Sequence, residues 1–144
     1  MIYKNDISCS LVVASSYEEL VNIRDFISVQ ALEFGFSNEI TQKIVLAVDE
    51  ACTNLIKYGY FQDHNKTIKI NIEHDKNAFI IKILDTSESF NPKDRPDTDV
   101  KTYIRQMLKG GLGIQIIKLV IDEIDYIPAN IDNNENVLIL KKFL

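Results

Sequence analysis

The spacing of apolar residues switches from strand-like to helical near the start of the chain. Residues 8–15, SCSLVVAS, are a β-branched run with turn formers on both sides, which predicts a strand. Over residues 16–34 the apolar side chains recur at three- and four-residue intervals, which predicts a helix. Ser16 and Glu19 make a capping-box pattern at its start, and Gly35 is placed to end it.

A second helical pattern follows directly. Ser37 is placed to cap its start, and Gly59 lies close to its end. Its apolar stripe consists of Ile40, Ile44, Ala47, Val48, Ala51 and Leu55. Glu50 and Asn54 border this stripe in the segment VLAVDEACTNLIKYGY, where a carboxylate and a carboxamide stand out among so many apolar neighbours.

The middle of the chain holds a hairpin and then a long polar segment. Residues 67–73 and 78–84 are rich in β-branched residues that alternate with polar ones, and the short connection HDKN predicts that they pair as a hairpin. The segment from residue 85 to residue 109 contains two of the three prolines and many polar residues. A loop of that length inside a compact domain is usually functional, and often a lid.

The last third returns to regular structure. After the glycines of GGLG, residues 114–124 predict a helix. Residues 124–128 and 137–143 predict closing strands around the polar turn DNNEN. The expected fold class is α+β: a two-layer sandwich of a mostly antiparallel mixed sheet with helices on one face.

Composition narrows the possible classes of protein. The 144 residues fit one compact domain, and the formal net charge of −5 argues against a non-specific nucleic-acid binder. No apolar run approaches the roughly 20 residues of a membrane helix, and the N-terminal residues lack a secretory signal pattern. Cys9 and Cys52 lie in apolar segments, as expected for small buried side chains in a reducing compartment. We therefore expect a cytoplasmic protein with no direct contact to nucleic acid or membrane.

Two polar sites could carry chemistry. Glu50 and Asn54 are four residues apart, so on a helix their side chains share one face. A carboxylate and an amide oxygen suit Mg²⁺, which proteins hold with few ligands plus phosphates and water; the alternative is a solvated helix edge. Asp85 ends an apolar strand, where it could bind a ligand or could simply form a turn.

The glycine cluster in KGGLGIQIIKLV is a third candidate. Closely spaced glycines before a helix allow backbone N–H groups to approach a phosphate at the positive end of the helix. The alternative is a tight loop-to-helix turn that needs the freedom of glycine. The phosphate-binding fingerprints of P-loop, Rossmann and eukaryotic-type kinase proteins are absent.

These sites occur in a recognisable order: acid–amide helix, strand-end aspartate, long lid, and glycines opening a helix. This order resembles the GHKL ATPase superfamily, which includes gyrase, sensor histidine kinases and mismatch-repair ATPases. Within it, DEACTNLIKYGY and GGLGIQIIKLVIDEI are most similar to the anti-sigma-factor serine kinases of the RsbW type. The resemblance covers nearly the whole chain. It implies a single histidine-kinase-like ATPase domain over residues 1–144, with an ATP lid at about residues 86–110.

The resemblance also implies roles for single residues. Glu50 matches the general base of the family, and Asn54 matches the amide that coordinates magnesium. Asp85 matches the aspartate that accepts a hydrogen bond from the exocyclic amine of adenine. At the end of the lid, the glycines matching Gly111 and Gly113 allow closure over the phosphates, and Leu112 and Ile114 belong to the same nucleotide-binding segment. Asp49 points elsewhere on the helix and is expected to have no catalytic role.

Two positions near the expected adenine site depart from the family pattern. Ser87 stands where the family usually has glycine, which gives the backbone less freedom near the base. The last hairpin of the family usually offers a Gly-Thr pair whose threonine helps to bind adenine, and here Glu135 and Asn136 take that place. Asn136 retains the ability to hydrogen-bond to a nucleotide.

The resemblance implies a regulatory kinase. Its members use ATP and Mg²⁺, sequester a sigma factor, and phosphorylate a small anti-anti-sigma protein of the STAS type on serine or threonine. They commonly form homodimers, which the apolar first strand could mediate here. The alternative is a non-catalytic binding module on the same fold, in which Ser87 and Asn136 mark a weakened nucleotide site.

Overall fold

The computed structural model describes residues 7–87 and 113–144. The chain begins with strand β1 (Ile7–Ala14), a short 3₁₀ turn η1 (Tyr17–Glu19) and helices α1 (Leu20–Phe34) and α2 (Asn38–Asn54). A π-helical turn η2 (Leu55–Gly59) extends α2, and the hairpin strands β2 (Thr67–Asp75) and β3 (Ala78–Asp85) follow. Helix α4 (Gly113–Val120) and strands β4 (Glu123–Ile127) and β5 (Asn136–Phe143) complete the described part.

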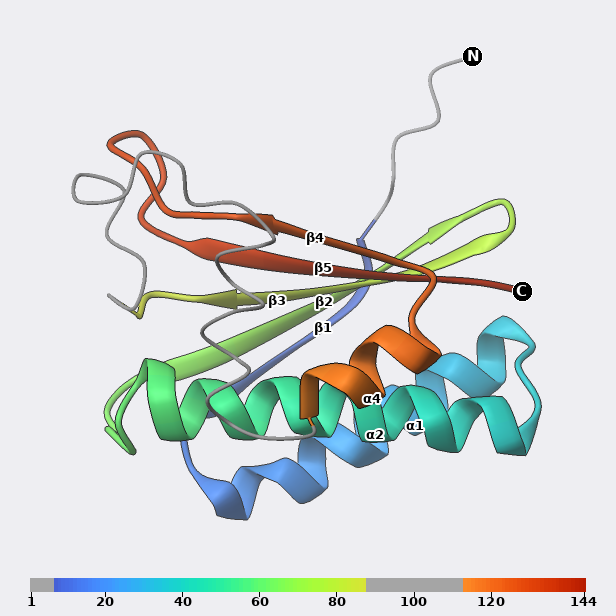
Figure 1. Cartoon of the computed structure of the whole chain (residues 1–144), viewed down its shortest axis with the longest axis horizontal. Coiled ribbons are helices and arrows are strands. Elements are labelled where there is room, and N and C mark those ends of the chain that lie inside the picture. The colour runs from blue at the N-terminus through green and yellow to red at the C-terminus, as the bar shows by residue number, and fades with distance from the viewer. Residues whose placement is uncertain (1–6, 88–112) are drawn as a thin grey trace.

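The strands form one five-stranded sheet in the order β1-β2-β3-β5-β4. Every neighbouring pair among these strands is antiparallel. Figure 1 shows α1, α2 and α4 together on one face of the sheet. The predicted α+β class, with helices on one face of the sheet, is confirmed, and the described strands include no parallel pair of the kind a mixed sheet would contain.

The core lies between the sheet and the helices because alternate strand residues point to one face. On the two central strands these residues are almost fully buried: Ile68, Ile70 and Ile72 of β2, and Phe79, Ile81 and Ile83 of β3. They pack against the buried stripes of α1 and α2, which include Ile23, Ile27, Ile44 and Val48. Burial of these large apolar side chains is the main force that holds the helices on the sheet.

Of the predicted signals at the ends of the first two helices, one differs from the structure. Ser16 caps the first turn, since its Oγ accepts a bond from the Glu18 amide at 3.4 Å, but the Glu19 carboxylate binds Asn22 at 2.9 Å instead of reaching back. The capping box is therefore incomplete. The predictions at Gly35 and Ser37 are confirmed, because Gly35 has φ 120° at the end of α1 and Ser37 Oγ accepts from the Ile40 amide.

The helix predicted to end at residue 124 ends at Val120. Sheet pairing wins over helical periodicity here, because Glu123 and Ile124 pair with Lys141 and Leu140 of β5. Asp122 holds the junction through its carboxylate, which accepts a bond from the Phe143 amide at 2.8 Å. The predicted end was wrong because one continuous apolar pattern covers two elements.

Two expectations about the chain as a whole can be compared with the structure. Cys9 and Cys52 are both free, and Cys52 is fully buried while Cys9 is half-buried. Burial raises the pKa of the Cys52 thiol strongly, with smaller contributions from Asp49 and Asp85, so this thiol stays protonated. Among the described helices, none is long and apolar enough to cross a membrane.

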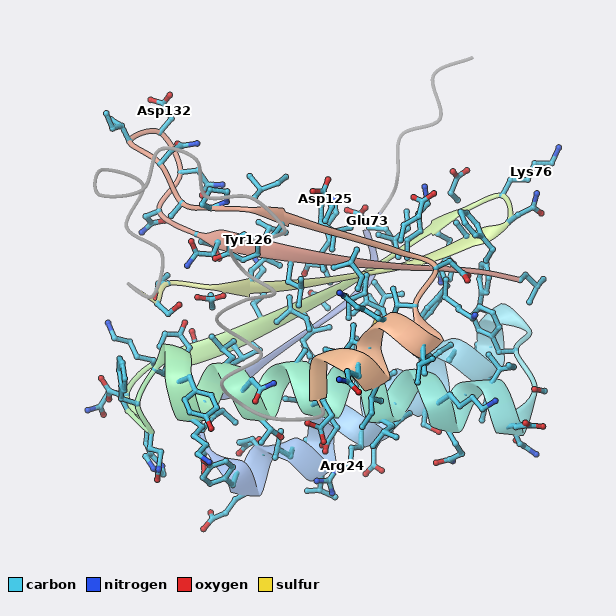
Figure 2. All side chains as sticks on the ribbon, viewed as in Figure 1. Arg24, Glu73, Lys76, Asp125, Tyr126 and Asp132 are labelled. Carbon is cyan, nitrogen blue, oxygen red and sulfur yellow. The ribbon has the colours of Figure 1, made fainter. Side chains whose placement is uncertain are left out.

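The topology brings the carboxyl ends of α2 and β3 to the same end of the molecule. In Figure 1 the green end of α2, the yellow end of β3 and the loop between β4 and β5 all lie at the left. The tight β2–β3 turn, marked by Lys76 in Figure 2, lies at the opposite end. The end of α2, which carries Asn54, and the end of β3, which carries Asp85, therefore lie at the same end of the molecule.

Candidate functional site

Two neighbouring acids on α2 have different environments. Asp49 forms an ion pair with Arg24 of α1, with 2.6 Å between Oδ1 and Nε. Figure 2 shows Arg24 on the outer side of the helical layer, away from the sheet. Glu50 is half-buried and takes part in no ion pair within residues 7–87 and 113–144. Of these two neighbouring acids, Asp49 is therefore the one that an ion pair holds at the outer side of the helices.

Asn54 is the last residue of α2, one turn beyond Glu50. Its side chain is buried, with 9% of its surface exposed. Its Nδ2 has no hydrogen-bond partner in the described part of the chain, which is uncommon for a buried amide. This nitrogen can donate to an acceptor of a ligand, and a flip of the amide would present the oxygen there instead.

This amide fits a magnesium ion that is bound mainly by phosphates. Mg²⁺ keeps most of its water or phosphate ligands and needs only one or two protein oxygens. In the described residues no three His, Cys, Asp or Glu side chains come together as a cage. The amide oxygen of Asn54 is of the ligand type that such an ion accepts.

Asp85 is a buried carboxylate at the end of β3, with 7% of its surface exposed. Its Oδ1 accepts bonds from the Ser87 amide at 2.8 Å and from Asn136 Nδ2 at 3.0 Å. Burial raises the pKa of Asp85, and bonds from the Ser87 hydroxyl, Asn136 and the Ser87 amide oppose the rise. The bond from the Ser87 amide closes a turn of the kind that aspartate often forms. Oδ1 therefore has the turn-forming role that was predicted as the alternative to ligand binding.

A carboxylate that accepts hydrogen bonds from three donors can accept a further one. Two carboxylate oxygens offer about four acceptor positions, so a ligand N–H can bind in addition. The exocyclic amine of adenine is such a donor. The local turn and a role in ligand binding are therefore compatible at Asp85.

Asn136 is fully buried and uses its whole amide within the protein. Its Nδ2 donates to Asp85 Oδ1 at 3.0 Å and to the Ser87 carbonyl at 2.9 Å. Its Oδ1 accepts from the Ala129 amide at 2.8 Å. The amide thus ties β5 to the end of β3 and orients the Asp85 carboxylate.

The π turn η2, which extends α2, packs directly on the segment that contains Asp85 and Ser87. A Cβ added at Gly59 would lie 2.7 Å from Leu55 Cδ1 and 3.4 Å from Ser87 Oγ, so a larger residue here would displace the Leu55 side chain and crowd Ser87. Tyr60, the next residue, accepts a hydrogen bond from the Thr86 amide at 2.7 Å. Segments far apart in the sequence therefore meet around residues 85–87.

The structure brings together some of the predicted site residues and leaves others apart. Asp85, Ser87 and Asn136 are joined directly by hydrogen bonds. Glu50 and Asn54 lie on the adjacent helix, and no hydrogen bond between described residues links them to this trio. Each predicted role at these five positions stays a prediction.

The predicted lid and glycine cluster fall largely outside the described residues. This applies to residues 88–110 of the lid, to Gly111 and Leu112, and to the side chain of Ile114. Gly113 is the first residue of α4, which packs on α2. The prediction that glycines precede a helix agrees with this start of α4.

Tyr60 is a residue that the sequence patterns did not single out. The π-helical turn η2 places it inside the molecule, with 4% of its surface exposed. In a regular helix its position would follow from the 3.6-residue period, and the wider π turn shifts it. Its only signal was the tyrosine directly after Gly59 in KYGY.

Comparison with known proteins supports a family assignment. Residues 13–142 match the family described as histidine kinase-like ATPase domain. Serine-protein kinase RsbW of Bacillus subtilis (strain 168) is 27% identical over 107 residues, which are 71% of this chain and 66% of that protein. The protein of the same name from Bacillus pumilus (strain SAFR-032) is 28% identical over 115 residues, covering 75% and 70%.

The alignment with the Bacillus subtilis relative therefore spans just under two thirds of that protein's length. The family match, by contrast, extends over nearly the whole chain, and it includes α2, Asp85 and Asn136. The chain belongs to the histidine kinase-like ATPase domain family.

Proposed function

We propose that the chain is an ATP-dependent serine/threonine kinase that sequesters a sigma factor and phosphorylates an anti-anti-sigma protein of the STAS type. The observation that carries the proposal is the buried Asp85 carboxylate, held by three donors beside the end of a helix that bears Glu50 and Asn54. The similarity to proteins named serine-protein kinase supports the reaction type. The partners follow from the resemblance to the RsbW type.

Each residue has a chemical task in this proposal. Asp85 accepts a hydrogen bond from the adenine amine, and Asn54 offers its amide oxygen to Mg²⁺, which neutralises phosphate charge when it is bound. Glu50 accepts the proton of the attacking hydroxyl. Phosphoryl transfer depends mainly on positioning and charge stabilisation, so this small set is sufficient. Gly111 to Ile114 would close over the phosphates.

A binding and transfer assay tests the proposal. We expect isothermal titration to detect ATP binding that requires Mg²⁺, and γ-labelled ATP to transfer its label to a cognate anti-anti-sigma protein. A variant with Asn54 replaced by alanine should lose most of the Mg²⁺ dependence. ATP binding without transfer to any candidate partner from the same genome would reject the kinase and leave only a nucleotide-binding protein.

One observation favours a second candidate function. The Ser87 hydroxyl and Asn136 already donate to Asp85, and this lowers the capacity of the carboxylate for a nucleobase. A non-catalytic module that holds its partner by surface contacts would need no such capacity. Absence of binding at millimolar ATP with Mg²⁺ would favour this candidate over the kinase.

We also propose that the protein forms a homodimer, as the family commonly does. Strand β1 is an edge of the described sheet, and Val12 on it is 59% exposed. Exposed edge strands with apolar side chains tend to pair with another chain. Size-exclusion chromatography with light scattering should give about twice the 16.5 kDa mass of one chain, and a monomer at working concentrations would contradict the proposal.

A further inference from the structure

We propose that Tyr60 is a positioning residue that fixes the strand end carrying Asp85 and thereby makes the site select adenine over guanine. The inference rests on the proposed ATP binding and adds a residue with no assigned role. It concerns how the base-binding carboxylate is held in place. Tyr60 itself need not touch the nucleotide.

The Tyr60 hydroxyl lies between two strands. It donates to the Thr67 carbonyl at the start of β2, at 2.8 Å, and accepts from the Thr86 amide at 2.7 Å. A third contact, to Thr86 Oγ1, is 3.4 Å long. Thr86 directly follows Asp85, so one buried hydroxyl fixes the backbone next to the carboxylate.

Tyr60 is itself held by an unusual stretch of backbone. Its amide donates to the Leu55 carbonyl at 2.8 Å, which closes the π turn. The next two residues, Phe61 and Gln62, have positive φ values of 51° and 61°. Non-glycine residues adopt this conformation at a cost, and it persists when surrounding contacts require it. The buried Tyr60 side chain, bonded to both strands, supplies such contacts.

The segment from Asp85 to Ser87 is held from two sides. Tyr60 holds Thr86 from the helical side, and Asn136 holds the Ser87 carbonyl and Asp85 Oδ1 from β5. If the Tyr60 bond is removed, Asn136 still holds the segment to β5 and Ser87 still packs against Gly59, but no hydrogen bond then holds the Thr86 backbone to Tyr60. We expect the carboxylate to be less tightly fixed relative to Asn54, which lies at the end of α2.

The position of the Asp85 carboxylate matters for base selection because adenine and guanine carry different groups at the position that the carboxylate would contact. Adenine presents an amine donor at position 6, and guanine presents a carbonyl acceptor. A fixed carboxylate therefore attracts adenine and repels guanine. A carboxylate with positional freedom can move away from the guanine carbonyl, so it discriminates less.

Tyr60→Phe tests the proposal because it removes the hydroxyl and keeps the ring that fills the core. We expect the ATP dissociation constant to rise about tenfold, as for one lost hydrogen bond, while GTP binding changes little, so that the preference for ATP falls. The value of kcat at saturating ATP should stay unchanged. Tyr58→Phe is the matched control, since Tyr58 lies in the same π turn and is only half-buried, with Lys57 over its ring.

Amide hydrogen exchange of the nucleotide-free protein provides a second measurement that does not depend on ATP. Tyr60→Phe should speed exchange at Thr86 and Ser87, and leave amides in the centre of β3, such as Ile81, as protected as in the wild type. Equal loss of ATP and GTP binding, with faster exchange throughout the sheet, would indicate general destabilisation and overturn the proposal.

The two measurements separate this inference from the proposed function. Unchanged exchange at Thr86 overturns the positioning role whether or not ATP binds. Faster exchange with an unchanged ATP preference overturns the link to base selection. A wild-type protein that does not prefer ATP to GTP overturns the selection role together with the proposed ATP site, while a change in exchange at Thr86 would still show that Tyr60 fixes the strand end.

Discussion

Replacing Glu50 with alanine is expected to leave ATP binding nearly unchanged and to lower phosphotransfer by about 100-fold or more. The reason is that a general base contributes about 100- to 10,000-fold to such a reaction, while a carboxylate beside the phosphates adds little to nucleotide affinity. Glu50 is half-buried on α2, one turn before Asn54. Initial rates with γ-labelled ATP and the cognate anti-anti-sigma protein, together with ATP titrations, measure both effects.

The adjacent acid provides the control. Asp49→Ala also removes one carboxylate from α2, but this carboxylate is paired with Arg24 on the outer side of the helices. A partly exposed ion pair contributes little to stability, about 0–1 kcal/mol, so the variant should fold and transfer phosphate normally. Equal rates for the two alanine variants would mean that Glu50 is not the base. A loss of ATP binding in Glu50→Ala would indicate a different role for Glu50.

Local signals along the chain predicted much of the fold because they act over a few residues. Ser37 and Gly35 mark helix ends through bonds to nearby backbone groups, and both predictions are confirmed. The end of the last helix was wrong because a distant strand decides it: residues 123 and 124 pair with β5. The sheet order, with β5 between β3 and β4, likewise depends on packing that no local pattern carries.

In the candidate site, too, local patterns predicted some features, while features that depend on long-range contacts could not be predicted. A helical spacing of four residues was enough to place Glu50 and Asn54 on α2. The bond from Asn136 to Asp85 could not be derived from periodicity, because it joins strands that are far apart in the sequence. Tyr60 was missed since a π turn changes the direction of the side chain, and the sequence contains no established signal for that turn.

Asp85→Asn is expected to weaken ATP binding by about 10- to 100-fold. The substitution replaces a charged acceptor by a neutral amide, and a hydrogen bond to a charged group contributes about 1.5–3 kcal/mol. ATP binding to the wild type should also fall as the pH is lowered through the pKa of Asp85, which burial raises above the ordinary value, because the protonated carboxyl is a poorer acceptor. Titrations from neutral pH into acid measure both the variant and the wild type.

The same substitution is expected to stabilise the nucleotide-free protein at neutral pH. Because the folded pKa of Asp85 lies above the unfolded value, its favourable contribution to folding is fully present below the unfolded pKa and is lost as pH rises through the folded pKa. The amide of Asp85→Asn carries no charge at any pH, so the variant's advantage in urea midpoint should be largest above the folded pKa and should vanish in acid. Glu135, whose charge also raises the pKa of Asp85, adds to the effect.

Asp132→Asn, at the exposed tip of the β4–β5 loop in Figure 2, is the control and should show no such pH-dependent gain. If Asp85→Asn is less stable than the wild type at neutral pH, the carboxylate is an essential structural acceptor, and its burial would then require no ligand to explain it.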